Sequence, residues 1–348
     1  MIDFRYHLVS IVAVFLALAI GIVLGATNLR GGTLDLLQST NDSLKNQLTA
    51  AQAARDGYLS QSSAAEQYLQ SAEPTLLARQ LKGESLVIVT EPGAQGSVVD
   101  GIKQAAALAG ATVTGEVALQ PKFNDISGAN QSSLSSINNS IVSRDGATLA
   151  TGSNPQTTYQ QQAAQLIATA ILASTTTAVA PTDAQQILSA YAQGGYLTVS
   201  PAGAPTAPAQ LAVIVTPESA PADGQNDPAN QVLLAVAQEF ASASSATLVA
   251  GSALGSAQSG SAMSVLRSSS VSSQVSSVDD ADLTLGQITV VDALANQLAG
   301  KKPNSYGISG ASAVSPSPLP TPTATATSTP TQTATPHSTT TRKAGAKK

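Results

Sequence analysis

Few side chains in this sequence can ligate a soft metal ion or act as a catalytic nucleophile. The 348 residues contain no cysteine, two methionines and two histidines. Thiolate, thioether and imidazole groups are the ligands that soft and borderline transition metals select. Of the four candidates, Met1 and His7 lie at the start of the chain beside the apolar run, Met263 lies in the folded region and His337 lies in the tail. We therefore expect no such metal centre within one subunit and assign no metal ligand.

The same scarcity argues against catalysis. A serine nucleophile activated by histidine needs that histidine in its own cleft, which His7 and His337 are badly placed to supply. The turn from Glu91 to Gly96 follows an apolar run, where phosphate-binding turns occur. It has neither the glycine spacing of a dinucleotide site nor the lysine of a P-loop, and a plain strand-to-helix turn explains its glycines. We expect no enzyme activity and no cofactor.

Carboxylates cluster near the end of the folded region, at Asp279, Asp280, Asp282 and Asp292. Oxygen ligands of this kind suit a hard cation such as Ca²⁺, but their spacing is not that of an EF-hand loop. The simpler prediction is a solvated loop followed by a helix cap.

The element that must position everything else is the run Leu8–Ala26, which has no ionisable side chain. A helix of about nineteen residues crosses a hydrocarbon core roughly 30 Å thick. We predict an uncleaved transmembrane signal anchor over residues 1–30, with Leu8, Ile11, Phe15, Ile20 and Leu24 as anchor residues. Two alternatives remain. One is a cleaved signal peptide, which Leu24 disfavours because the cleavage site wants a small side chain there, and the other is a buried helix of a soluble domain.

The charges on either side of the apolar run give only a weak indication of how the anchor is oriented in the membrane. The positive charges that flank the apolar run differ little between its two ends. We place the N-terminus in the cytoplasm and the bulk of the chain outside, in the cell membrane or envelope, because a long lysine-poor chain with a Thr/Pro-rich end suits that side. A net charge of -5 is not that of a basic nucleic-acid binder.

A heptad pattern follows the anchor over residues 33–82 and predicts a coiled-coil stalk. Identical anchors start in one membrane, so a parallel homodimer is the expected arrangement, with Asn41 as the buried amide that fixes register. Gly57, Arg55 and Ser62 weaken the pattern, and the alternative is a single amphipathic helix folded onto the next domain. The predicted seam residues are Leu34, Leu37, Asn41, Leu44, Leu48, Ala51, Tyr58 and Leu69. Pro74 predicts a kink or a new helix start.

We predict that residues 84–310 form the folded domain. Short apolar runs recur at Ser85–Thr90, Thr112–Val117, Gly195–Ser200, Leu211–Thr216 and Ala246–Gly251. Helical patterns lie between them, one of them opened by the cap Asp227 and by proline at the first helical position. Strands that alternate with helices predict a mostly parallel, Rossmann-like α/β sheet, whose strand order the sequence leaves open. The Ser-, Asn-, Gln- and Thr-rich residues 127–182 predict a partly loose insertion with one helix over 159–172.

Residues 311–348 form a tail rich in threonine and proline. Such a composition cannot bury a core, so we predict disorder, and it fits an extended stalk whose glycosylation stays open.

Several segments in order resemble the MctB family of actinobacterial cell-envelope proteins, named for copper transport at the mycobacterial outer membrane. They are the opening MIDFRYHLVSIVAVFLALAIGIVLGA, the heptad region, SLVIVTEPGA, and SSVDDADLTLGQITVVDALANQLAGKKPNSYG. The resemblance runs from Met1 to about Gly307, and the Thr/Pro tail departs from it. It supplies no site residues.

The resemblance implies a single-pass envelope protein tied to copper homeostasis, acting through an extracytoplasmic partner-binding domain, and some relatives are linked to envelope assembly and division. The shortage of soft ligands disagrees with direct copper handling. Two alternatives stay open: a dimeric envelope scaffold for wall assembly or division without a metal role, and an oligomeric pore.

Overall fold

The computed structural model describes residues 4–145, 148–152, 154–173, 181–201, 205 and 207–316. Most of the predicted tail, with His337, lies outside these residues, as does Met1. The helices are α1 (Phe4–Leu77), α2 (Gly96–Leu108), α3 (Gly128–Asp145), α4 (Thr158–Ile171), α5 (Pro181–Gln193), α6 (Pro228–Ala243), α7 (Ala253–Ser256), α8 (Ala262–Ser268) and α9 (Thr284–Leu298). The strands are β1 (Ser85–Thr90), β2 (Thr112–Leu119), β3 (Leu197–Ser200), β4 (Leu211–Val215), β5 (Ala246–Ala250), β6 (Ser276–Val278) and β7 (Ser305–Tyr306), and η1 (Pro121–Asn124) is a 3₁₀ turn.

The described strands form one sheet in the order β3-β2-β1-β4-β5-β6-β7. Every neighbouring pair is parallel except β2 with β3, which confirms the mostly parallel α/β prediction. The chain moves outward from β1 to β2 and then returns to place β4 on the other side of β1. The order therefore reverses between β1 and β4, where open α/β sheets commonly bind ligands.

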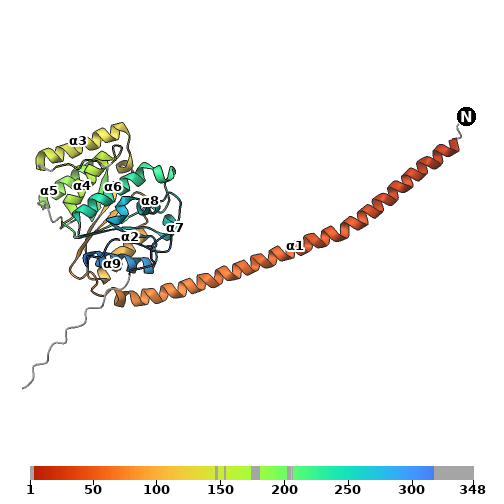
Figure 1. The fold of residues 1–348 in the computed structure, drawn as a ribbon, viewed down its shortest axis with the longest axis horizontal. Helices are drawn as coiled ribbons and strands as arrows, with labels where there is room; N and C mark the ends of the chain where they lie inside the picture. The colour runs from red at the N-terminus through yellow and green to blue at the C-terminus, as the bar shows by residue number, and fades with distance from the viewer. Residues whose placement is uncertain are drawn as a thin grey trace, which may run out of the picture. The chain divides into compact units, whose positions relative to one another are not determined.

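Helices cover both faces of this sheet (Figure 1), with α2 and α9 on one face and α4, α6 and α8 on the other. Successive side chains of a strand point to opposite faces. Val87, Val89 and Ile214 accordingly join the core under α4 and α6, while the alternate residues, such as Ile88, are buried toward the other face. Both faces are apolar because both are covered.

The segment predicted as a partly loose insertion is more ordered than its composition suggests. Its described residues include α3 as well as the predicted helix, which appears as α4. Leu134 and Ile141 of α3 are buried in the core, and the buried amide of Asn138 donates to the carbonyl of Tyr159 over 3.0 Å. Two buried apolar side chains and one buried amide thus pack α3 against the core, although most of its residues are polar.

The long helix α1 is continuous from Phe4 to Leu77. It contains Pro74, so the predicted new helix start there is wrong, because a proline near the end of a helix removes only one backbone hydrogen bond and the helix continues past it. The alternative prediction of a kink at Pro74 stays a prediction. Its segment Tyr6–Ala26 has a mean hydropathy of 2.9, and no part of that segment is buried. The alternative of a buried helix in a soluble domain is therefore wrong, because the rest of the described chain leaves this apolar surface uncovered.

The C-terminal part of α1 contacts the sheet domain through α9. The N–H of Thr284, the first residue of α9, donates to Glu66 Oε1 of α1 over 3.0 Å, and the Thr284 hydroxyl donates to the same oxygen. A carboxylate there satisfies an N–H that the helix itself leaves unpaired and faces the positive end of the helix dipole. Glu66 thus acts as the cap of α9 from a distant part of the sequence.

We expect Glu66→Ala to destabilise the first turn of α9 by about 1 kcal/mol, as the loss of a helix cap does. Amide hydrogen exchange at residues 284–288 of the full chain should then be roughly fivefold faster, while exchange in β4 stays unchanged. Gln67→Ala, at the neighbouring exposed position of α1, is the control. Equal exchange in the parent and in Glu66→Ala would contradict the capping role.

Candidate functional site

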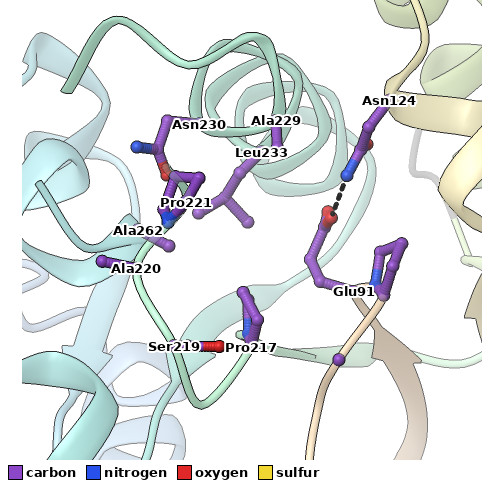
Figure 2. Close-up of a pocket in the computed structure, with 12 residues that line it drawn as sticks. Glu91, Asn124, Pro217, Ser219, Ala220, Pro221, Ala229, Asn230, Leu233 and Ala262 are labelled. Atoms are coloured by element: carbon purple, nitrogen blue, oxygen red, sulfur yellow. Dashed lines mark hydrogen bonds between the residues drawn. The ribbon is translucent and has the colours of Figure 1, made fainter. Parts of the chain in front are cut away.

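A pocket opens at the carboxyl ends of β1 and β4, at the reversal of the strand order. Its volume is about 210 Å³. Figure 2 shows Glu91 and Asn124 on one side of it, Ala229 and Leu233 of α6 across from them, and Pro217 below. The described lining residues are Glu91, Pro92, Gly93, Asn124, Pro217, Ser219, Ala220, Pro221, Ala229, Asn230, Leu233 and Ala262.

The turn after β1 places Glu91 in this pocket. The N–H of Glu91 donates to the Val215 carbonyl over 2.9 Å, which continues the ladder between β1 and β4, and the Glu91 carbonyl accepts from the N–H of Ala94 over 3.0 Å. Gly93 has a φ of +91°, and a Cβ there would lie 3.3 Å from Cβ of Pro217. Glycine is favoured at this point because the backbone is left-handed and closely approaches the loop after β4.

Glu91 is the most unusual side chain of the pocket. Only 4% of it is exposed, and one carboxyl oxygen, Oε2, accepts from Asn124 Nδ2 over 3.3 Å. The buried atoms Glu91 Oε1 and Asn124 Oδ1 have no hydrogen-bond partner. Burial raises the pKa of Glu91 from 4.5 to about 7, although the hydrogen bond from Asn124 acts to lower it. The pocket thus holds a carboxyl group that titrates near neutral pH.

Core packing and helix capping fix the walls of the pocket. Phe123, which precedes Asn124 in η1, is fully buried. On the opposite wall, α6 begins with the predicted cap, since Asp227 Oδ1 accepts from the N–H of Ala229 over 2.9 Å and Pro228 follows the cap. Asn230 Nδ2 donates to the carbonyls of Gly224 and Gly260. The polar groups of the α6 terminus are therefore already used within the protein.

The titration of Glu91 should contribute to the pH dependence of the free energy of unfolding. A pKa that is higher in the folded state than in the unfolded state contributes stability fully below about pH 4.5, and this contribution is lost as the pH rises through about 7. We expect Glu91→Gln, which cannot ionise, to match its parent near pH 4.5 and to exceed it by about 2–3 kcal/mol near pH 8.5.

Urea unfolding of the full chain in detergent, followed by the near-ultraviolet circular dichroism of the buried Tyr191 and Tyr196, measures this difference. Asn124→Leu removes the hydrogen bond that lowers the pKa of Glu91, so it should move the midpoint of the pH dependence upward. If Glu91→Gln and its parent differ by the same amount at every pH, the assignment of the titration to Glu91 is wrong.

A second buried carboxylate group lies at the end of β6, where the sequence predicted a solvated loop. Asp279 and Asp280 are both fully buried, so that prediction is wrong for them. Arg267 Nη1 lies 2.7 Å from Asp279 Oδ2, and the N–H of Ile308 donates to Asp279 Oδ1 over 2.7 Å. Asp279 thus joins Arg267 to the loop around Gly307, a set of contacts that the sequence did not reveal.

The other members of this acidic run have separate surroundings. Both carboxyl oxygens of Asp280 are buried without a hydrogen-bond partner, and its pKa is raised to about 6, first by burial and then by the charge of Asp279. Asp282 Oδ1 accepts from the N–H of Ala253 over 2.8 Å. Burial also raises the pKa of Asp292, in α9, to about 6. The described residues contain no group of three or more His, Asp or Glu side chains placed to hold a metal ion.

The structure does not bring the other residues singled out in the sequence together at one site. Met263 is buried in the core beneath α6, and His7 is exposed on α1. The predicted anchor residues Leu8, Ile11, Phe15, Ile20 and Leu24 are all more than half exposed. Of the predicted seam, Leu37, Asn41, Leu44, Leu48, Ala51 and Tyr58 are exposed, Leu69 is half-buried, and the side chain of Leu34 lies outside the described residues. A single chain does not test pairing, so the coiled coil stays a prediction.

Sequence reasoning missed the pocket residues. It treated the turn at Glu91 as a plain connection and left the strand order open, so it had no means of bringing Glu91 to the loop after β4. One signal was present, because a carboxylate directly after a mostly apolar strand falls at the carboxyl edge of a parallel sheet. Asn124 gave no comparable signal.

Comparison with known proteins assigns the chain to a family. The sequence profile described as "Copper transport outer membrane protein, MctB" matches residues 1–316. The chain is 31% identical over 319 residues to a protein named "Copper transporter MctB" from Mycobacterium tuberculosis, an alignment that covers 90% of this chain and 98% of the relative. It is 30% identical over 326 residues to the protein of the same name from Mycobacterium leprae, with 90% and 99% coverage. The chain therefore belongs to the MctB family.

Proposed function

We propose that this protein is a single-pass envelope protein that acts in copper homeostasis through its α/β domain. The observation that carries the proposal is the family match, which extends over residues 1–316 and so includes the apolar segment, the rest of α1 and the sheet domain. The relatives with full-length similarity are named as copper transporters. The N-terminus lies in the cytoplasm in this proposal, and the α/β domain lies outside the membrane.

The role in copper homeostasis is indirect in this proposal. Cu(I) selects sulfur ligands and Cu(II) selects imidazole, whereas the chain has no cysteine, two methionines and two histidines. Met263 is enclosed in the core. The α/β domain instead acts as a non-catalytic binding module for an envelope partner, and its pocket is the feature best suited to recognise a ligand.

Pairing of two chains through α1 completes the proposal. Leu37, Leu44 and Leu48 are each about 60% exposed or more in the single chain. Large apolar side chains repeated along one helix favour a covering partner, and a second α1 anchored in the same membrane is the nearest one. Crosslinking through an engineered cysteine at Leu48 in intact cells tests this pairing, and a chain that stays monomeric under oxidation would contradict it.

Growth across a copper series tests the copper role. Deleting the gene should change copper sensitivity, and the full chain should restore it. Because the role is indirect, a chain carrying His7→Gln and Met263→Leu should restore it as well. Unchanged growth of the deletion strain would overturn the copper role, whereas failure of a normally folded double variant would overturn the indirect mechanism.

A further inference from the structure

We infer that the pocket between β1, η1 and α6 binds a small molecule that carries a primary ammonium group on a compact apolar body. This inference goes beyond the copper role and does not depend on it. It rests on the polar atoms that the fold leaves unused, on the lining of the pocket and on its place in the sheet.

The unused polar atoms are both acceptors. Glu91 Oε1 and Asn124 Oδ1 are buried and have no hydrogen-bond partner. Their head groups are already joined by the bond from Asn124 Nδ2 to Glu91 Oε2, so the two free oxygens belong to one cluster. Leaving a buried acceptor unpaired costs about 1–3 kcal/mol, and a ligand with several N–H donors on one atom removes that cost at both oxygens together.

The sign of the charge favours a cation. Glu91 is the one ionisable side chain among the described lining residues, which include no lysine, arginine or histidine. The N-terminus of α6 would otherwise attract an anion, but Asp227 already supplies a carboxylate there and accepts from the N–H of Ala229. An anionic ligand would meet the Glu91 carboxylate without a compensating positive charge, whereas an ammonium group pairs with it directly.

The rest of the pocket favours a short apolar body. Pro217, Pro221 and Leu233 line it together with Ala229 and Ala262, and Figure 2 shows Leu233 facing the space beside Glu91. A cavity volume of about 210 Å³ admits a branched alkyl group of a few carbons but not a nucleotide. The position at the reversal of strand order is where such sheets bind ligands.

Isothermal titration of the full chain in nanodiscs with isobutylamine, isobutanol and isobutyric acid tests the inference, since the three probes share a shape and differ in charge. We expect isobutylamine to bind at about millimolar affinity, the level that so few atoms permit. Glu91→Gln should weaken its binding roughly 10- to 100-fold, the range for a hydrogen bond to a charged group. Asn124→Ala should cause a smaller loss.

Glu239→Gln is the matched control. Glu239 is also partly buried with a raised pKa, and it accepts from Gln161 over 2.7 Å outside the pocket, so its replacement should leave isobutylamine binding unchanged. Glu91→Gln is expected to fold at least as stably as its parent, so lost binding would not reflect unfolding. The inference is overturned if isobutanol or isobutyric acid binds as tightly as the amine, if the amine does not saturate, or if Glu91→Gln binds it normally. None of these results bears on copper sensitivity, which the growth series measures separately.

Discussion

Arg267→Met is expected to lower the free energy of unfolding by about 3–5 kcal/mol, because it leaves a buried carboxylate without its counter-charge. Asp279 is completely buried, and 12% of the Arg267 side chain is exposed. The guanidinium also donates to the carbonyls of Tyr306 and Ser309, over 2.8 and 2.6 Å. Removing the arginine therefore also removes these two hydrogen bonds to β7 and to the loop that follows it.

The matched control is Lys103→Met. Lys103 Nζ lies 2.7 Å from Glu116 Oε2, the same separation, but the two side chains are 35% and 22% exposed. Water screens this pair, so its loss should cost at most about 1 kcal/mol. Urea unfolding of the full chain in detergent compares the two. Equal losses in both variants would show that burial does not decide the strength of the Arg267 pair.

Gly307→Ala is expected to destabilise the same region by about 3–5 kcal/mol, through strain and overlap together. Gly307 has a φ of +123°, where a side chain is strained, and a Cβ there would lie 2.0 Å from Asp279 Oδ1. That oxygen cannot move aside because it accepts from the N–H of Ile308 over 2.7 Å. The alanine methyl group would therefore displace Asp279 and break its hydrogen bond to the N–H of Ile308 in the loop after β7.

Gly300→Ala separates the two causes. Gly300 also has a positive φ, of +77°, but an added Cβ would meet no atom within 4 Å. It should cost only about 1 kcal/mol, the price of the left-handed backbone alone. Unfolding curves for the two alanine variants give the difference directly. If Gly307→Ala is no less stable than Gly300→Ala, the close approach to Asp279 has no energetic consequence.

Local patterns predicted much of the fold. The runs that became β1, β4 and β5 were visible because a strand covered on both faces is mostly apolar. The start of α6 was visible because Asp227 and Pro228 are a cap signal that acts within one helical turn. By contrast, β6 and β7 are only three and two residues long, too short to show a period, and α3 was hidden because its polar face outweighs its few buried positions.

The candidate site was harder to predict because its parts come from distant segments. Glu91 is a surface-type residue by composition, and only the return of β4 beside β1 encloses it. Asp279 and Asp280 resembled a solvated acidic loop for the same reason. Arg267, which pairs with Asp279, lies 12 residues before it, and Ile308, whose N–H donates to it, lies 29 residues after it.

The sequence by itself determined the apolar segment near the N-terminus, the helical period that follows it, the alternation of strands and helices, and the resemblance to the MctB family. These properties depend on interactions between residues close together in the chain, so composition and spacing report them. Only the tertiary structure decided the strand order, the burial of Glu91 and the pairing of Asp279 with Arg267. Burial and electrostatics depend on which distant segments meet, and a carboxylate changes its pKa and its partners only when those segments exclude water from it.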